Sequence, residues 1–342
     1  MSAVHIEKKA KLAGEPLVIG THSGTFHCDE ALAVFMLKLL PQYKDASVVR
    51  TRDPATLDTC DIVVDVGGVY DESVHRYDHH QRGFTEVFGQ GFNTKLSSAG
   101  LVYKHFGKDI LSQVTSVPVS DPSIQTLHLK LYEAFIEAID GIDNGVSQYV
   151  TSEPARYRSS TDLSSRVGGL NPRWNEKSDN SILDEKFQVA SALTGSEFLS
   201  KLSYLHEAWL PARSLVQAAF EKRTSVHPSG KVIVFEDFAP WKEHLFNVEE
   251  DAGIKDEDKP LYVLYPDEAA NAWRIQAIPK SGESFESRKA MPEPWRGVRD
   301  QELSGLIGID GCIFCHAAGF IGGNKTFEGA LKMADASLAY SS

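Results

Sequence analysis

The stretch Arg76-Tyr77-Asp78-His79-His80-Gln81-Arg82-Gly83 sets a carboxylate and two imidazoles next to one another in the chain. Such a run is poorly suited to a core and well suited to a site. Histidine nitrogens together with carboxylate oxygens favour Mn²⁺, Zn²⁺ or Fe²⁺ over Ca²⁺, and adjacent ligands can reach two ions, or one ion and its substrate. Taken alone, the triplet 78–80 also fits a solvated loop or a helix cap, so its interpretation depends on the rest of the chain.

With 342 residues, 42% of them hydrophobic and 24% charged, the chain fits a globular protein of two domains. No stretch reaches the roughly eighteen apolar residues of a membrane span, and residues 1–16 lack the apolar core of a signal peptide. We therefore expect no membrane association. Four cysteines without a signal peptide fit free thiols in a reducing compartment. The expected location is intracellular, in the cytoplasm, the nucleus or both, with a mitochondrial fraction as the alternative.

The charge balance restricts how the chain can meet a polyanion. It carries 35 Lys and Arg against 47 Asp and Glu, a formal charge of -12, which is the opposite of a protein that coats nucleic acid in bulk. A polyanion must therefore be met locally. Divalent cations gathered by carboxylates would reverse the sign of the field at such a place.

The N-terminal part alternates strand and helix patterns. Residues 17–20, 47–50 and 62–68 read as buried strands, and apolar residues at helical spacing predict an amphipathic helix from Asp29 to Leu40. Strands that are apolar on both faces indicate a parallel sheet covered by helices, and the active residues of such sheets lie beyond the carboxyl ends of the strands.

Polar side chains occupy these strand ends. His22, His27 and Asp29 follow the first predicted strand, and Asp65 ends the third, before the glycine pair 67–68. A carboxylate at the end of a buried strand is more readily explained as a ligand than as a stray charge. Asp29 has a second interpretation, because it also fits a helix N-cap.

Three more helices follow. One is predicted from Ser97 or Ser98 to Phe106 with Gly107 just past its end, one over 124–139, and one over 187–223 as a bridge between domains.

Asp140 and Asp143 lie at the C-terminal edge of the second of these helices, three residues apart and on one helical face. Either of them could close a metal site, or both could belong to an ordinary C-terminal turn.

Beyond the bridge, short strands over 231–235, 261–265 and 273–278 predict a second, α+β domain. We place the first domain at 1–195 and the second at 196–342. The run from Cys312 to His316 matches the pattern of c-type haem attachment, but the glycine-rich sequence after it argues against haem, and the spacing of the four cysteines argues against zinc.

The candidate ligands form four groups along the chain: His22/His27/Asp29, Asp65, Asp78-His79-His80 and Asp140/Asp143. In this order, the groups resemble motifs I to IV of the DHH phosphoesterase superfamily, which includes nucleases and pyrophosphatases. One branch of it, the melanocyte proliferating gene family of metal-dependent hydrolases and 3'-5' RNA exonucleases, is similar over nearly the whole chain. The strings that carry this resemblance are THSGTFHCDEALA (21–33), DVGGVYD (65–71), RYDHHQRGF (76–84) and HAAGFIGG (316–323).

The resemblance implies an α/β protein. A parallel-sheet DHH domain would hold two divalent cations, with Mn²⁺ favoured over Mg²⁺ or Co²⁺, and a smaller C-terminal DHHA1-like domain would close over them, with the active site in the cleft. Two departures matter. The family usually has an aspartate in motif I where this chain has His27, which bears on metal preference. The family usually has the sequence GGGH two residues before an AAG sequence, whereas in this chain His316 directly precedes AAG. His316 could therefore also be a core histidine.

Roles for the residues follow from this resemblance and from two-metal chemistry. Asp65 would bridge the ions, and His80 would face the scissile phosphate, with Asp65, Asp78 and His80 as the catalytic group. The metal ligands would be His22, His27, Asp29, Asp65, Asp78, His79, Asp140 and Asp143. The residues expected to bind the substrate are Arg82, Arg288, Arg296, His316, Gly322 and Gly323.

The function we expect is 3'-5' exonuclease activity on single-stranded RNA or short oligonucleotides, in RNA processing. The alternatives are a small-molecule phosphoesterase acting on dinucleotides, nucleotides or pyrophosphate, and a binding protein that retains the fold. Base-stacking platforms would favour the first of these functions, and the candidates are Trp174, Trp241, Trp273 and Trp295. The sequence leaves a homodimer open.

Overall fold

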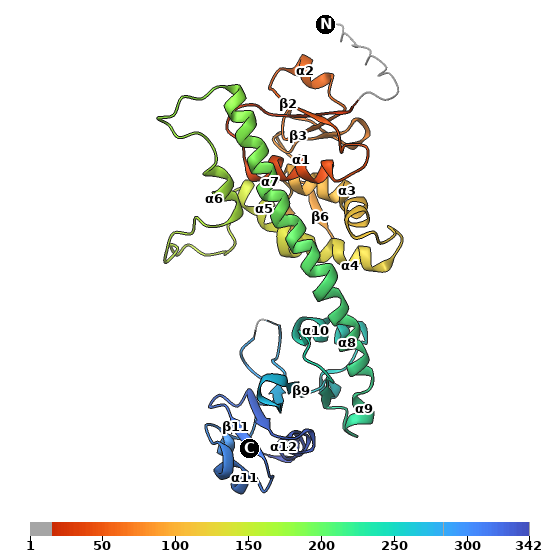
Figure 1. Cartoon of the computed structure of the whole chain (residues 1–342), viewed down its shortest axis with the longest axis vertical. Coiled ribbons are helices and arrows are strands. Elements are labelled where there is room, and N and C mark those ends of the chain that lie inside the picture. The colour runs from red at the N-terminus through yellow and green to blue at the C-terminus, as the bar shows by residue number, and fades with distance from the viewer. Residues whose placement is uncertain (1–15, 283, 342) are drawn as a thin grey trace. The chain divides into compact units, whose positions relative to one another are not determined.

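The computed structural model describes residues 16–282 and 284–341. The chain divides into two compact units, one ending at His206 and the other starting at Glu207 (Figure 1). The expected domain boundary at 195 falls inside helix α7 (Asn180–Tyr204), which continues along the chain through the π-helical turn η3 (Leu205–Trp209) into α8 (Leu210–Glu221).

The first unit contains a sheet of strand order β2-β1-β3-β5-β4. In this order β2, β1, β3 and β5 pair in parallel with their neighbours, and only the short edge strand β4 pairs antiparallel, with β5. This confirms the predicted parallel sheet and the α/β class. The strands are β1 (Val18–Thr21), β2 (Ser47–Arg50), β3 (Ile62–Val64), β4 (Tyr70–Asp71) and β5 (Arg76–Tyr77). A separate hairpin is formed by β6 (Val87–Gly89) and β7 (Phe92–Lys95).

Helix α1 (Cys28–Lys38) is buried on nearly every side, although its sequence predicts an amphipathic helix. The reason is tertiary, since α1 packs against β3 and also against α3 (Ser98–Thr115) and α7 (Figure 1). Its first turn is covered as well, so that Asp29 and Glu30 are fully buried. The enclosure of α1 therefore removes two carboxylates from water.

Helix α3 continues through Gly107, so the prediction that it ends before this glycine was wrong. A Cβ atom at position 107 would lie 2.6 Å from Nε2 of His128 in α4 (Pro122–Leu131). Gly107 thus permits the close approach of two helices, and a helix interior tolerates glycine at a cost of about 1 kcal/mol.

The predicted helix over 124–139 is a longer helical run in three parts, α4, the π-helical turn η2 (Tyr132–Ile136) and α5 (Glu137–Asp143). Such π-helical turns shift the side chains that follow relative to a regular helix. The Tyr132 hydroxyl, at the start of the turn, donates to Oδ2 of Asp140 (2.9 Å). Two shorter helices complete this unit, α2 (Pro54–Asp58) and α6 (Leu163–Gly168).

The second unit is built on a mixed sheet of order β11-β12-β10-β9-β8. Its strands are β8 (Val232–Val234), β9 (Tyr262–Asp267), β10 (Ala272–Ala277), β11 (Cys312–Cys315) and β12 (Ile321–Asn324), and its helices include α9 (Arg223–Val226), α10 (Trp241–Asp251), α11 (Asp300–Ile307) and α12 (Phe327–Ala339). This confirms the three strands predicted beyond the bridge. No helix within the described residues is long and apolar enough to cross a membrane.

Gly322 and Gly323, which the sequence suggested as substrate-binding residues, lie inside strand β12 and are buried. A Cβ atom at Gly323 would lie 2.6 Å from Nη1 of Arg274, and one at Gly322 would lie 3.0 Å from the carbonyl oxygen of Phe314. These glycines let neighbouring groups pack closely against the strand.

The close contact at Gly107 generates a prediction about stability. Gly107→Ala should lower the free energy of unfolding by about 1–3 kcal/mol, because the gain in helix propensity is smaller than the cost of overpacking against the His128 ring. Denaturant unfolding followed by circular dichroism measures the change.

The matched control is Gly141→Ala in α5, where the nearest atom to a new Cβ is 3.9 Å away. This variant should unfold at the same denaturant concentration as the wild type or at a slightly higher one. Equal midpoints for Gly107→Ala and Gly141→Ala would show that the helices separate without cost.

Candidate metal centre

Asp65, directly after strand β3, lies at the centre of the candidate site. Its backbone φ is +59°, a left-handed conformation that residues with a Cβ rarely adopt, and only 3% of the residue is exposed. Oδ2 lies 3.3 Å from Nε2 of His22, whereas Oδ1 lies 3.2 Å from Nε2 of His79. The two oxygens of one buried carboxylate thus face two different imidazoles.

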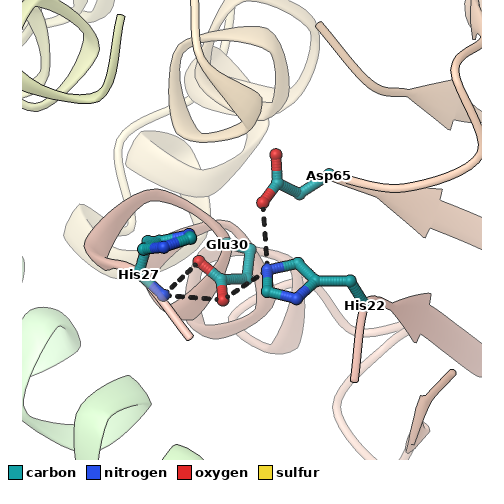
Figure 2. A group of neighbouring side chains, drawn as sticks. All are labelled: His22, His27, Glu30 and Asp65. Atoms are coloured by element: carbon teal, nitrogen blue, oxygen red, sulfur yellow. Dashed lines mark hydrogen bonds and ion pairs between the residues drawn. The ribbon is translucent and has the colours of Figure 1, made fainter. Parts of the chain in front are cut away.

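On the Oδ2 side, the side chains of His22, His27, Glu30 and Asp65 converge (Figure 2). Each offers a ligand atom within 4.8 Å of the others. The Glu30 carboxylate contacts Nε2 of His22 at 2.9 Å and accepts the backbone N–H of His27 at 2.8 Å, so it also caps helix α1.

Glu30 was missed in the sequence because a glutamate in the first turn of a helix is sufficiently explained by the helix dipole. The signal that could have found it is its position three residues after His27, at the start of a helix that follows a strand end.

On the Oδ1 side, His79 is the common partner of three carboxylates. Its Nε2 lies 3.2 Å from Asp65, 3.2 Å from Asp143 and 3.9 Å from Asp29. Asp65, His79 and His80 form a second group with ligand geometry, and His27, Asp29 and Asp143 form a third. Asp65 and His27 each belong to two groups, which makes the site one continuous cluster.

Asp140 and Asp143, which the sequence could not distinguish, have different surroundings. Asp140 is fully buried, and its oxygens accept hydrogen bonds from Ser97, Gly100 and Tyr132. Asp143 belongs to the cluster, whereas Asp140 is in none of its three groups. Asp140 fixes the N-terminus of α3 against α5.

Asp78 organises the loop that carries the two histidines. Its Oδ1 accepts the backbone N–H groups of His79 (2.8 Å) and His80 (3.1 Å) and contacts Nδ1 of His80 at 2.7 Å, and its Oδ2 accepts from Gly68 (2.5 Å). The His80 side chain is 61% exposed. The hydrogen bond to Asp78 raises the pKa of His80.

Several buried polar atoms of the cluster make no hydrogen bond with the described residues. Asp29 Oδ1, Asp65 Oδ1 and both ring nitrogens of His79 have no hydrogen-bond partner among the described residues. His79 and Asp65 approach each other but do not align for a hydrogen bond. Buried polar atoms are normally satisfied, and a divalent cation between these oxygens and nitrogens would satisfy them. The residues therefore fit a metal.

Burial and neighbouring charges shift the pKa values of the carboxylates in the cluster. Burial raises the pKa of Glu30 to about 8, and burial together with the Asp29 carboxylate raises that of Asp143 to about 8. Burial opposes ionisation of Asp65, but its contacts with His22 and His79 outweigh burial and lower its pKa to about 2. A bound cation would stabilise all of these carboxylates in their charged form.

The expected substrate-binding residues of the second unit have partners of their own. Glu249 holds the Arg288 guanidinium through two hydrogen bonds (2.6 and 2.7 Å), and the Arg288 side chain is 10% exposed. A phosphate at Arg288 would have to compete with this carboxylate. Arg296 is exposed, and its Nε donates to the carbonyl of Met291 (2.9 Å).

His316 is exposed, so its interpretation as a core histidine was wrong. Its Nδ1 accepts the backbone N–H of Ala318 at 3.1 Å. In the first unit, Arg82 is exposed in the loop that follows His80. The substrate contacts expected of Arg82, Arg296 and His316 stay predictions.

Comparisons with known proteins identify the family. The model described as "Uncharacterised protein family (UPF0160)" matches residues 18–338. The MYG1 exonuclease of Homo sapiens is 51% identical over 337 residues, 97% of this chain and 88% of the human protein. The MYG1 protein C27H6.8 of Caenorhabditis elegans is 50% identical, over 93% of this chain and 94% of the nematode protein.

Among solved structures, the crystal structure of exonuclease RecJ bound to manganese aligns with 95% of this chain and 91% of its own, at 9% identity and a TM-score of 0.24, which is too low to support an argument. The family model and the curated relatives cover nearly the whole chain, and they confirm the resemblance read from the four sequence strings. The chain belongs to the MYG1 exonuclease family.

Proposed function

We propose that the protein is a divalent-metal-dependent 3'-5' exonuclease that hydrolyses single-stranded RNA through a two-metal site. The observation that carries this proposal is the Asp65 carboxylate, whose two oxygens face the two sides of the cluster. A carboxylate shared in this way is suited to bridge two cations. The curated relatives named exonucleases support the choice of a nuclease among the reactions that such a site can serve.

Each flank of the cluster would hold one ion. His22, His27 and Glu30 would bind on the Oδ2 side of Asp65, and His79, Asp29 and Asp143 on the Oδ1 side. Paired divalent cations supply a nucleophilic hydroxide at neutral pH and neutralise charge on the phosphate and the leaving oxygen. The three imidazoles make the site softer than an all-oxygen site, which favours Mn²⁺ or Co²⁺ over Mg²⁺.

His80 is the residue of this chain that we assign to the scissile phosphate. Asp78 holds Nδ1 of His80, which leaves Nε2 of an exposed ring to contact substrate. Because Asp78 favours the charged imidazolium, His80 would donate a hydrogen bond to a phosphate oxygen and stabilise the negative charge that develops on it.

The second candidate, a small-molecule phosphoesterase, differs in what it needs around the site. Trp174 and Tyr157 in the first unit are 97% and 80% exposed. Exposed aromatic rings can stack on the bases of a nucleic acid strand, whereas pyrophosphate has no bases. Trp241 and Trp295 are buried in the second unit, so the expectation that they also stack on bases was wrong. The exposed aromatic residues favour a nucleic-acid substrate.

Metal removal is the first test of the proposed mechanism. Excess EDTA should abolish hydrolysis of end-labelled RNA with little change in circular dichroism, and Mn²⁺ or Co²⁺ should restore more activity than Mg²⁺. Asp65→Ala should lower kcat by roughly a hundredfold or more, because the bridging carboxylate is lost. Full activity in excess chelator would refute the metal mechanism.

A paired substitution tests the assignment of the two aspartates in α5. Asp143→Ala should weaken Mn²⁺ binding and lower kcat by roughly a hundredfold while the protein remains as stable as the wild type. Asp140→Ala should instead lower the free energy of unfolding by about 1–3 kcal/mol, because buried donors of α3 lose their acceptor. Calorimetric Mn²⁺ titration and denaturant unfolding of both variants separate the roles, and the reverse pattern would exchange them.

The products test the exonuclease assignment. Linear single-stranded RNA labelled at its 5' end should be shortened progressively with release of mononucleotides, whereas circular RNA of the same sequence should persist. End-labelled DNA and pyrophosphate, incubated in parallel with Mn²⁺, measure the preference for RNA. Rapid cutting of the circle would identify an endonuclease, and hydrolysis of pyrophosphate alone would identify the small-molecule enzyme.

A further inference from the structure

The loop between strand β1 and helix α1 carries two of the candidate metal ligands. His22 lies at the start of this loop, directly after β1, and His27 lies at its end, directly before α1 (Figure 2). Both side chains belong to the group on the Oδ2 side of Asp65. Their distance from each other therefore depends on how the backbone between them is held.

Side chains from the neighbouring strand hold the first half of the loop. The carbonyl of Ser23 accepts from Nε of Arg52 at 3.3 Å, and the carbonyl of Gly24 accepts from Nη2 of Arg50 at 2.7 Å. Arg50 ends strand β2 and Arg52 follows it, and β2 pairs with β1. The sheet itself thus fixes the loop near His22.

A residue distant in the chain, Asn171, holds the second half of the loop. Oδ1 of Asn171 accepts the backbone N–H of Phe26 at 3.1 Å, and Nδ2 donates to the Phe26 carbonyl at 2.9 Å. One side-chain amide thus pairs with both backbone groups of a residue, as the opposite residue does in an antiparallel strand pair. Phe26 is fully buried, so without Asn171 these two groups would lose their partners away from water.

Asn171 follows helix α6, which borders the metal cluster. Helix α6 packs against α1, α5 and α7. Its residues Ser164 and Gly168 line a recess of about 570 Å³ whose lining also includes His79 and Asp143. Asn171 is not among the lining residues of this recess. Its position is therefore suited to act on the ligand loop and not on a substrate in the recess.

Holding a ligand loop before an ion arrives increases the affinity for that ion. When only a fraction of the molecules has the loop in ligand geometry, the apparent affinity is reduced by that fraction. Each hydrogen bond contributes about 0.5–1.5 kcal/mol, so losing the two bonds of Asn171 is enough to change such a fraction by tenfold or more. The carboxylates of Glu30 and Asp65 also lie in this group, and their mutual repulsion favours a more open loop in the absence of metal.

We propose that Asn171 is a positioning residue of the metal centre. By holding both backbone groups of Phe26, it keeps His27, the next residue, and His22 at the distance that a shared cation requires. The proposal rests on the metal-dependent function proposed above and adds to it a residue that contacts neither the ion nor the substrate.

Substitution of Asn171 tests this role in the full-length protein. Asn171→Ala removes both hydrogen bonds, and calorimetric titration should show a dissociation constant for Mn²⁺ raised by roughly tenfold to a hundredfold, the range typical when a group that orients a metal ligand is lost. Asn171→Gln keeps the amide on a longer side chain, so it should lose less affinity than Asn171→Ala.

The matched control is Asn93→Ala. Asn93 is an exposed residue of strand β7 in the same unit, and its Nδ2 donates to the carbonyl of Gly91 at 3.3 Å. This variant should bind Mn²⁺ with the affinity of the wild type.

Denaturant unfolding with and without Mn²⁺ separates positioning from a purely structural role. A purely structural residue lowers the free energy of unfolding by the same amount in both conditions. Asn171→Ala should lower it more when Mn²⁺ is present, because a ligand stabilises the folded state according to its affinity. At saturating Mn²⁺, a tenfold weaker affinity corresponds to an additional loss of about 1.4 kcal/mol. Asn171→Gln provides the same comparison if Asn171→Ala does not fold without metal.

Hydrolysis of end-labelled RNA by the wild type tests the proposed function separately. If the wild type binds Mn²⁺ and cleaves no RNA, while Asn171→Ala loses affinity for Mn²⁺, the nuclease function fails and the positioning role holds. If the wild type cleaves RNA while Asn171→Ala binds Mn²⁺ with unchanged affinity, or loses equal stability with and without Mn²⁺, the positioning role is overturned and the nuclease function stands. A wild type that binds no Mn²⁺ would overturn both.

Discussion

The two-sided contact of the buried Asp65 carboxylate with His22 and His79 is the interaction on which the rest of the first unit depends. It requires the ends of β1 and β3 and the loop after β5 to meet, and parallel pairing of these strands brings them to one edge of the sheet. It also requires a left-handed backbone at Asp65, whose N–H is held by the carbonyl of Tyr77 (3.1 Å). Sheet register and site geometry are thus set together.

Helix α3 holds the carboxylates of two other helices at its N-terminus. Ser98 donates through its backbone N–H and its hydroxyl to Asp29 of α1, and Ser97 does the same to Asp140 of α5. Gly100 has to be a glycine, because a Cβ there would lie 2.3 Å from Asp140 Oδ2. The positive end of the α3 dipole faces both carboxylates and stabilises their negative charge. Substitutions in α3 would therefore disturb the cluster without touching a metal ligand.

The sequence predicted the parts of the site that depend on local pattern. Asp65 and His79 follow buried strands, and that position alone marks them as site residues. The partners of Asp140 and Arg288 lie far away in the chain, since Asp140 meets Ser97 and Arg288 meets Glu249. Glu30 meets His22 across the loop between β1 and α1, and that contact depends on how this loop folds. Likewise, nothing in the pattern of α3 reveals that His128 needs the space at Gly107. Tertiary packing decided each of these cases, and local periodicity does not encode it.

Charge also sets the order of binding events that we expect. The chain is acidic, and the carboxylates of Asp29, Glu30, Asp65 and Asp143 lie together in the cluster, so without cations the cluster would repel a phosphate-bearing substrate. Divalent ions would reverse the sign of this field, since each would bring two positive charges directly to the carboxylates. On this argument, metal binding would precede the binding of a phosphate-bearing substrate.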